Sequence, residues 1–226
     1  MIDLKGYSGF CLTTEDHSPE ANNISMYCMM KDISVVRVKE SYSCLHNLIP
    51  SGSVDWCLKS LGKHITPNYY PQWCKHLLYR NVWKGDKWLL QKVFVKPADR
   101  HKRFTGFITN GTYSKKKKPP FWFSDIVQFT DEYRYYVTEG KVVFADWYWN
   151  EDNPDGTIIQ PPQLELDVPN DWSGTIDMGY LATSEFALIE CHPPFACGWY
   201  GGSNNIEVYM QWLIDGWIYL NNLKGE

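Results

Sequence analysis

Hydrophobic and polar residues alternate over short stretches of the second half of the chain, and this pattern predicts β-strands. Strands are predicted at residues 88–97, 104–109, 122–129, 132–138, 141–148, 175–182 and 185–191. Glu139 and Gly140 form a turn signal between two of these strands and predict a hairpin. Residues 150–174 are rich in proline, asparagine, aspartate and glycine, so we expect a long loop there.

The first 65 residues have a mixed pattern, with one short predicted strand at 33–39 and a helix at 55–61 that Ser53 would cap. Pro71 is well placed to start another helix, because proline is tolerated in a first helical turn. Apolar residues at helical spacing over 206–220 predict a C-terminal helix, capped by Asn204 or Asn205. Its apolar stripe is interpreted as part of the core.

The composition is that of an ordinary globular protein and changes this picture little. Of 226 residues, 44% are hydrophobic and 21% are charged, and the net charge is −4. This acidic balance argues against general affinity for nucleic acid. Aromatic residues reach 16% and have two interpretations, a core and surface rich in rings or a groove that stacks a base or a peptide.

The seven cysteines are scattered, odd in number and without a CxxC pair, which argues against a disulfide framework and a structural zinc. Reduced, mostly buried thiols in a cytoplasmic protein are the simplest account. No signal peptide and no membrane-spanning segment are predicted, since no apolar run approaches the roughly 18 residues that a span needs.

A run of four lysines, Lys115 to Lys118, is the one local exception to the acidic balance. It is interpreted either as a solvated loop between strands or as a flexible basic loop near a phosphate or an acidic partner.

Asp177, Glu190 and His192 are the strongest candidates for chemistry. Asp177 lies on one predicted strand and Glu190 near the end of the next, so a hairpin would bring their carboxylates together. His192 follows two positions later and shares the face of Glu190 if the strand continues. Glu190 interrupts an apolar run, where a carboxylate is costly unless it is paired or bound to a metal. Two converging carboxylates suit Mg²⁺, although two unrelated surface acids remain an alternative.

Lys96 ends a predicted apolar strand, where its ammonium group can neutralise a phosphate. The segment that follows contains Arg100, Lys102 and Arg103 and ends at Gly106, which suggests a phosphate-binding loop between two strands. A solvated hairpin loop is the alternative. No GxxxxGK[ST] motif is present, so this segment is not a Walker A loop.

Gln128 and Phe129 lie where an apolar strand gives way to polar residues before the pattern resumes. Such a hinge can present backbone groups to the edge of an adenine base. Arg134, farther along the same pattern, is expected either to contact a phosphate or a substrate carboxylate, or to form a structural ion pair with Glu132.

In their order along the chain, these pieces resemble the ATP-grasp superfamily. The resemblance is carried by FVKP, IVQF, the EYRYYV–EG–KVVF hairpin and DMGY…ALIECHPP. IPSGSVDW, YYPQW, FVKPADRHKRFTGF and CGWYGG are similar to a divergent clade that includes a eukaryotic translation-initiation factor assembly protein and phage and bacterial relatives. The resemblance extends from about residue 48 to the end of the chain.

The resemblance implies an α+β fold in which two α+β subdomains, with mostly antiparallel sheets, clasp ATP. It implies an N-terminal region at 1–65, a small subdomain at 66–128 and a large subdomain with the metal site at 129–226.

The resemblance also assigns roles to single residues. Lys96 would hold the ATP phosphates, Gln128 and Phe129 would lie beside adenine, and Asp177 and Glu190 would bind magnesium. Arg100, Lys102, Arg103 and Arg134 match basic positions near the γ-phosphate. The family commonly has asparagine two residues beyond the second acid, as a third metal ligand. This chain has His192 there, a less usual ligand for magnesium.

The implied reaction is carboxylate–amine ligation, in which ATP phosphorylates a carboxylate and an amine attacks the acylphosphate. The implied substrate is an amino acid, a peptide or a protein. A nucleotide-binding assembly factor with little or no turnover is the alternative, which the histidine at 192 favours slightly. A nucleic-acid binder that uses the lysine run is a third alternative, which the net charge disfavours.

Overall fold

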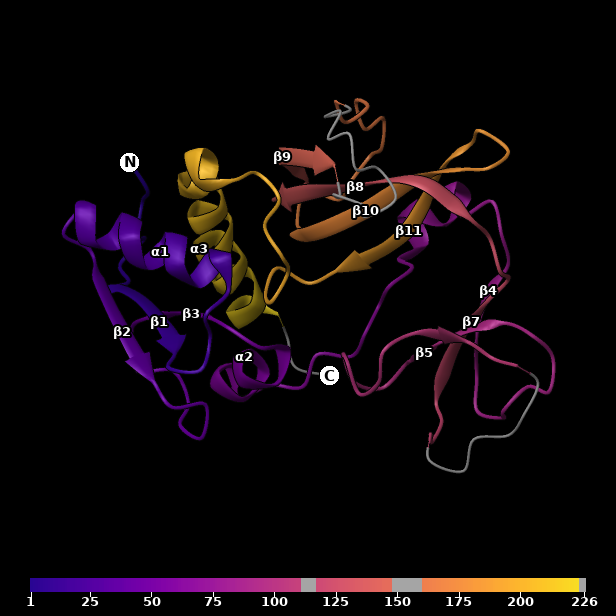
Figure 1. Cartoon of the computed structure of the whole chain (residues 1–226), viewed down its shortest axis with the longest axis horizontal. Helices are drawn as coiled ribbons and strands as arrows, with labels where there is room; N and C mark the ends of the chain where they lie inside the picture. Colours follow the sequence, from indigo (N-terminus) through magenta and orange to yellow (C-terminus); the bar gives the residue numbers. More distant parts are fainter. Residues whose placement is uncertain (111–116, 148–159, 224–226) are drawn as a thin grey trace.

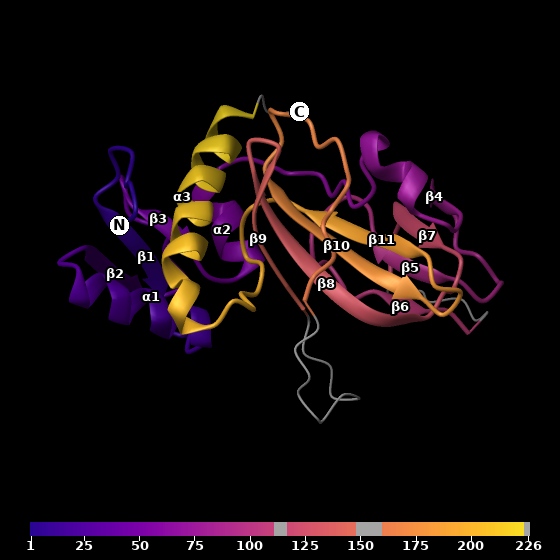
Figure 2. The ribbon, with the colours of Figure 1, turned by 90° about the horizontal axis from the view of Figure 1, so that it is seen from above.

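The computed structural model describes residues 1–110, 117–147 and 160–223, which form three sheets and three α-helices (Figure 1). The N-terminal elements and the C-terminal helix α3 lie at one end of the molecule and the smaller antiparallel sheet lies at the other (Figures 1 and 2). No helix in these ranges is long and apolar enough to cross a membrane.

The N-terminal sheet is parallel, with the order β2-β1-β3. Its strands are β1 (Gly9–Thr13), β2 (Ser34–Val38) and β3 (Ile49–Ser51), and its helices are α1 (Pro19–Met30) and α2 (Val54–Leu61). Ser53 caps α2 as predicted, since its side chain accepts from the Trp56 N–H, and Gly62 ends the helix in the left-handed conformation. Helix α3 (Ile206–Asn222) packs its apolar side chains into the same core, beside α1 and β3.

The small sheet is antiparallel, with the order β4-β7-β5-β6. It contains β4 (Val82–Gly85), β5 (Phe94–Pro97), β6 (Phe107–Ile108) and β7 (Phe121–Ser124). A 3₁₀-helix, η1 (Gln72–Leu77), precedes it and begins directly after Pro71. Buried valine and phenylalanine side chains, with Trp88 and Leu89 packed against them, fill one face of this sheet.

The large sheet is also antiparallel, with the order β11-β10-β8-β9. It contains β8 (Phe129–Thr138), β9 (Lys141–Trp147), β10 (Gly174–Leu181) and β11 (Phe186–His192), and a short 3₁₀-helix, η2 (Ser203–Asn205), leads into α3. The α+β class with mostly antiparallel sheets is confirmed. The predicted subdomain boundaries at residues 65 and 128 remain a prediction.

Three strand predictions were wrong in part. The strand predicted at 104–109 is confined to Phe107–Ile108, since residues 104–106 are not paired in the sheet. Residues 88–93 are not a strand, because the Trp88 ring stacks on Phe107 and meets Phe121 edge-on from a loop. The strand predicted at 122–129 ends at Ser124, where the chain leaves the small sheet, and it enters the large sheet at Phe129. Strands β1, β3 and β4 and helix α1 were not predicted, and α1 has only a weak segregation of apolar side chains.

Candidate functional site

Three neighbouring strands of the large sheet place charged side chains in one row. Asp177 on β10 lies opposite Arg134 on β8 and opposite Glu190 on β11. Side chains that face each other across strands lie on the same face of a sheet, so the row forms one surface. Farther along β11, His192 lies opposite Thr175 and shares this face. The predicted hairpin therefore does bring Asp177, Glu190 and His192 together.

Arg134 and Asp177 form a bidentate ion pair at the centre of the row. The Arg134 Nε and Nη2 atoms donate to the two Asp177 carboxylate oxygens at 2.8 and 2.7 Å. The residues are 7% and 3% exposed. The ion pair suggested with Glu132 was therefore wrong in its partner, because Arg134 pairs with Asp177. Both guanidinium edges are used, because Nη1 also donates to the Gly198 carbonyl at 3.3 Å.

Lys96 reaches Glu190 from the other sheet. Its Nζ atom, at the end of β5, donates to Glu190 Oε2, and each side chain is 15% exposed. Burial opposes the charge on Glu190, but Lys96 and His192 outweigh it and hold the pKa of Glu190 well below its usual range. Burial likewise opposes the charge on Lys96, but Glu190 raises the pKa of Lys96 overall. This contact ties the small sheet to the large one.

The three β10–β11 residues have the geometry of a cation site. One ligand atom each from Asp177, Glu190 and His192 lies within 4.8 Å of the others. His192 Nε2 is 3.2 Å from Glu190 Oε1 and 3.8 Å from Asp177 Oδ2. Two carboxylates with one imidazole fit a divalent cation, with oxygen donors suited to Mg²⁺ and the imidazole better suited to a transition metal. Protein cations, Lys96 and Arg134, now balance the two acids.

The three predicted phosphate-binding cations of the loop between β5 and β6 lie in different places. Lys102 lines a cavity of about 260 Å³ together with Arg134 and His192. Arg100 instead pairs with Asp55 of α2 at 2.7 Å, on the surface. Arg103 lies 3.1 Å from Asp99 and donates to the Pro120 carbonyl. Thus the structure brings Lys102 to the site and holds Arg100 and Arg103 away from it.

This loop passes close to Lys96 at a glycine. A Cβ atom at Gly106 would lie 2.6 Å from the ring of Phe94 and 3.0 Å from Lys96 Cγ. A side chain at residue 106 would therefore push against Phe94 and the stem of Lys96.

Gln128 and Phe129 lie where the chain crosses from β7 to β8, between the two antiparallel sheets. The Gln128 carbonyl accepts from the Ala182 N–H at 3.2 Å, and the Arg80 guanidinium lies 5.6 Å above the Phe129 ring.

Only part of the lysine run can be placed. Lys115 and Lys116 lie outside the described residues, while Lys117 Nζ lies 4.0 Å from the centre of the Phe107 ring.

Sequence reasoning missed three residues of this region, Tyr69, Arg80 and His101, and considered Glu132 only as a partner of Arg134. Glu132 precedes Arg134 on the same face of β8, and burial, then the charges of Asp177 and Glu190, raise its pKa. Arg80 donates to the carbonyls of Leu188 and Ile189 on β11 and to the Ser124 hydroxyl. The paired tyrosines at 69 and 70 offered a signal, but Arg80 had none, because its contacts come from distant segments.

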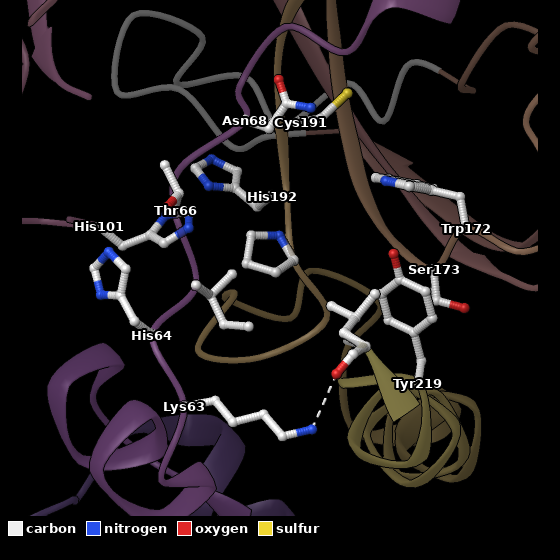
Figure 3. A pocket seen from close by; sticks show the side chains of 13 residues that line it. Lys63, His64, Thr66, Asn68, His101, Trp172, Ser173, Cys191, His192 and Tyr219 are labelled. Atoms are coloured by element: carbon white, nitrogen blue, oxygen red, sulfur yellow. Dashed lines mark hydrogen bonds between the residues drawn. The ribbon is translucent and has the colours of Figure 1, made fainter. Parts of the chain in front are cut away.

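Tyr69 and two histidines form an aromatic group beside the acids. The Tyr69 ring meets His101 at 5.6 Å and His192 at 5.8 Å, both edge-on, and Lys96 Nζ lies 5.0 Å from its centre. On the far side of His192, a cavity of about 240 Å³ extends toward α3. Figure 3 shows His64, His101 and His192 on one wall of this cavity, opposite Trp172 and Tyr219.

His101 predicts an acid-sensitive fold. It is 4% exposed, its Nε2 atom has no hydrogen-bond partner among the described residues, and burial, followed by the charge of His192, lowers its pKa to about 4. The unfolded chain binds a proton near pH 6.5 but the folded chain does not, so stability is lost as the pH falls below that value. Between pH 7.5 and 5.0 we expect a loss of about 2 kcal/mol in the free energy of unfolding.

Urea unfolding at the two pH values measures this loss, and His101→Gln should remove most of it. The matched control is His46→Gln at an exposed position, which should keep the wild-type pH dependence. Equal pH dependence in His101→Gln and the wild type would contradict the assignment.

Comparison with known proteins gives one decisive match. Residues 77–210, more than half of the chain, match the model of an ATP-grasp domain family, family 2 of one clade of that superfamily. No curated protein matches the chain significantly.

Solved structures show weaker similarity. A D-alanine–D-alanine ligase from Bacillus anthracis is 10% identical with a TM-score of 0.45, and the alignment covers 94% of this chain and 97% of that one. Its complex with ATP gives 12% identity, a TM-score of 0.44 and coverage of 95% and 97%. The ATP-grasp ligase PsnB, complexed with a minimal precursor, is 8% identical with a TM-score of 0.42, and the alignment covers 82% of this chain and 90% of that one. The family model alone therefore supports the assignment.

Proposed function

Since the chain belongs to this ATP-grasp domain family, we propose that it is an ATP- and Mg²⁺-dependent carboxylate–amine ligase that works through an acylphosphate. The substrate carrying the carboxylate or the amine is an amino acid, a peptide or a protein. One observation carries the proposal: Asp177, Glu190 and His192 gather beside Lys96 and Arg134, where the two antiparallel sheets meet.

Phosphoryl transfer needs positioning and charge neutralisation more than a covalent nucleophile. Lys96 is proposed to exchange Glu190 for phosphate oxygens when ATP enters, because its ammonium group already lies between the sheets. Arg134 keeps Asp177 oriented and borders the same cavity as Lys102. Gln128 and Phe129 are proposed to lie beside adenine at the crossing between the sheets.

Asp177 and Glu190 would hold Mg²⁺, with His192 as a third ligand. The ion, when bound, supplies positive charge to the phosphate oxygens during transfer. A cation at this position would also balance Glu190 once Lys96 has moved to the phosphates. Arg100 and Arg103 can reach the γ-phosphate only if their loop moves, since both are engaged elsewhere.

The products distinguish this reaction from its rivals. The protein is incubated with ATP, Mg²⁺ and pools of amino acids or peptides in the presence of hydroxylamine, which traps an acylphosphate as a hydroxamate. We expect substrate-dependent release of ADP and phosphate together with a hydroxamate detected by mass spectrometry. Release of AMP and pyrophosphate would point to an acyl-adenylate and would refute the acylphosphate mechanism.

Tight ATP binding without turnover in any pool would instead favour a nucleotide-binding assembly factor. We also propose that the chain is related to the eukaryotic translation-initiation factor assembly protein and to phage and bacterial proteins.

We further propose a cytoplasmic location, in which the seven free thiols would remain reduced.

A further inference from the structure

A third hollow lies beside the proposed site, at the C-terminal ends of β1 and β3. It has a volume of about 360 Å³ and is bordered by the first turns of α1 and α2. We call it the acidic crevice, because its lining contains Glu15, Asp16, Glu20 and Glu40 and neither lysine nor arginine. The proposed function leaves this crevice without a role.

The crevice adjoins the cavity of about 260 Å³ that Lys102, Arg134 and His192 line, which we call the central cavity. Both are lined by Ala196, Cys197 and Gly198, and the central cavity also contains Arg134 and His192. The Gly198 carbonyl accepts from Arg134 Nη1, so the crevice begins one hydrogen bond from the Arg134–Asp177 pair. A molecule in the crevice can therefore extend toward the place proposed for phosphoryl transfer.

The four carboxylates have no ion pair among the residues that the structure describes. Neutral donors hold two of them: the Ser18 N–H donates to Asp16 and the Trp199 N–H donates to Glu20, at 3.0 and 2.8 Å. The Ser53 hydroxyl donates to the Glu40 carboxylate at 2.5 Å, and the Glu40 N–H donates to the Glu15 carboxylate at 3.2 Å. Each carboxylate is oriented but not neutralised.

Positive charges around the crevice do not cancel its four negative ones. Two helix N-termini contribute roughly half a charge each. Arg37 donates to the carbonyls of Thr13 and Asp16, and the charge of Lys39 acts on Glu15. Neither of these side chains lines the crevice. The crevice therefore keeps a net negative charge.

Two buried hydroxyl groups add a second, independent feature. Thr13 and Ser51 line the crevice and are only 4% and 7% exposed. Their hydroxyls make no hydrogen bond within the described parts of the chain, although both residues end strands whose backbones are paired with a neighbouring strand. A hydroxyl oxygen in such a place can accept from an ammonium group.

We propose that the acidic crevice binds the amine substrate, and that this substrate carries at least two ammonium groups joined by a methylene spacer. A free polyamine and a basic amino acid share this chemistry. One nitrogen stays among the carboxylates and the hydroxyls of Thr13 and Ser51, and the other extends into the central cavity. The inference rests on the proposed function, because it assigns the acceptor of that ligation.

The reaction balances without a further reactant. The ammonium group in the central cavity loses one proton to solvent, and its nitrogen attacks the acyl carbon of the acylphosphate. A C–N bond forms and the C–O bond to phosphate breaks. The second proton leaves the nitrogen and is carried by the departing phosphate, so an amide and hydrogen phosphate result.

Calorimetric titration of the nucleotide-free full chain tests the crevice directly. Spermidine and lysine amide are the two probes, and butylamine is the singly charged comparison. We expect one site that binds spermidine or lysine amide at least about tenfold more tightly than butylamine. The tighter of the two probes identifies a free polyamine or an amino-acid amine as the source.

The test variant is Glu15→Gln combined with Glu40→Gln, which removes two charges at the rim while the amide oxygens can still accept the same hydrogen bonds. We expect it to weaken binding of the tighter probe about tenfold or more. The charge-matched control is Asp86→Asn combined with Glu185→Gln, both exposed and outside the crevice lining, which should stay within about twofold. A third variant, Thr13→Val, keeps side-chain volume and should weaken binding through the lost hydroxyl.

Equal weakening in the test and control variants would overturn the proposal, since it would show only general charge attraction. Displacement of the probe by an equal concentration of MgCl₂, or binding of glutamate in its place, would also overturn it. ATP binding with Mg²⁺ is measured separately on every variant and should not change. If the wild type fails to bind ATP, the proposed function falls, while the probe titrations still decide whether the crevice selects diamines.

Discussion

Replacing Glu190 by glutamine is expected to lower ATP turnover by about 10³-fold. Glutamine keeps the shape of the side chain but removes the charge that is proposed to hold Mg²⁺ with Asp177. The remaining carboxylate and His192 would bind the ion weakly, and the phosphates would lose a positive charge at the moment of transfer. ADP release at saturating ATP and substrate measures the effect, and Mn²⁺ binding followed by electron paramagnetic resonance reports the metal site without turnover.

The control is Glu185→Gln, an exposed acid in the turn before β11 that should leave both readouts unchanged. Thermal unfolding of both variants verifies that the fold is kept. Wild-type turnover in Glu190→Gln would remove this residue from the proposed mechanism, whereas lost turnover with intact Mn²⁺ binding would leave Glu190 a role in handling phosphate alone.

The acids of this site could be predicted because one hairpin carries them. Asp177 and Glu190 belong to adjacent strands joined by a short turn, so their meeting depends on local pairing that alternating hydrophobic residues already indicate. His192 follows from the same register. Strands β10 and β11 were predicted to within one residue at each end for the same reason, since they are neighbours in the sequence and pair with each other.

Contacts between distant segments could not be predicted in this way. The Lys96–Glu190 pair joins residues 94 positions apart on different sheets, and no local pattern determines how two sheets approach each other. Arg80 contacts β11 across 108 positions. The acidic crevice depends on a parallel sheet, whose strands pair only after a helical connection has been made, and β1 and α1 showed too little periodicity to be recognised.

The variant Lys96→Met distinguishes a structural role of Lys96, in holding the two sheets together, from its proposed role in binding the phosphates. Without metal, Glu190 loses its partner in a site where both side chains are 15% exposed, so we expect the free energy of unfolding to fall by about 2–3 kcal/mol. Mg²⁺ should then restore more stability to the variant than it adds to the wild type, because Lys96 no longer competes with the ion for Glu190. An ion at about 100 times its Kd adds about 2.7 kcal/mol, which is enough to offset the loss.

ATP affinity should change in the opposite direction, since the ammonium group proposed to hold the phosphates is gone. Lys96→Met is therefore expected to bind Mg²⁺ more tightly and ATP more weakly than the wild type, measured by urea unfolding in both states and by calorimetry. Lys92→Met, at an exposed position four residues earlier, is the control and should change neither. Weaker binding of both Mg²⁺ and ATP would mean that Lys96 only holds the two sheets together, because a ligand that merely lost its scaffold would lose affinity regardless of its charge.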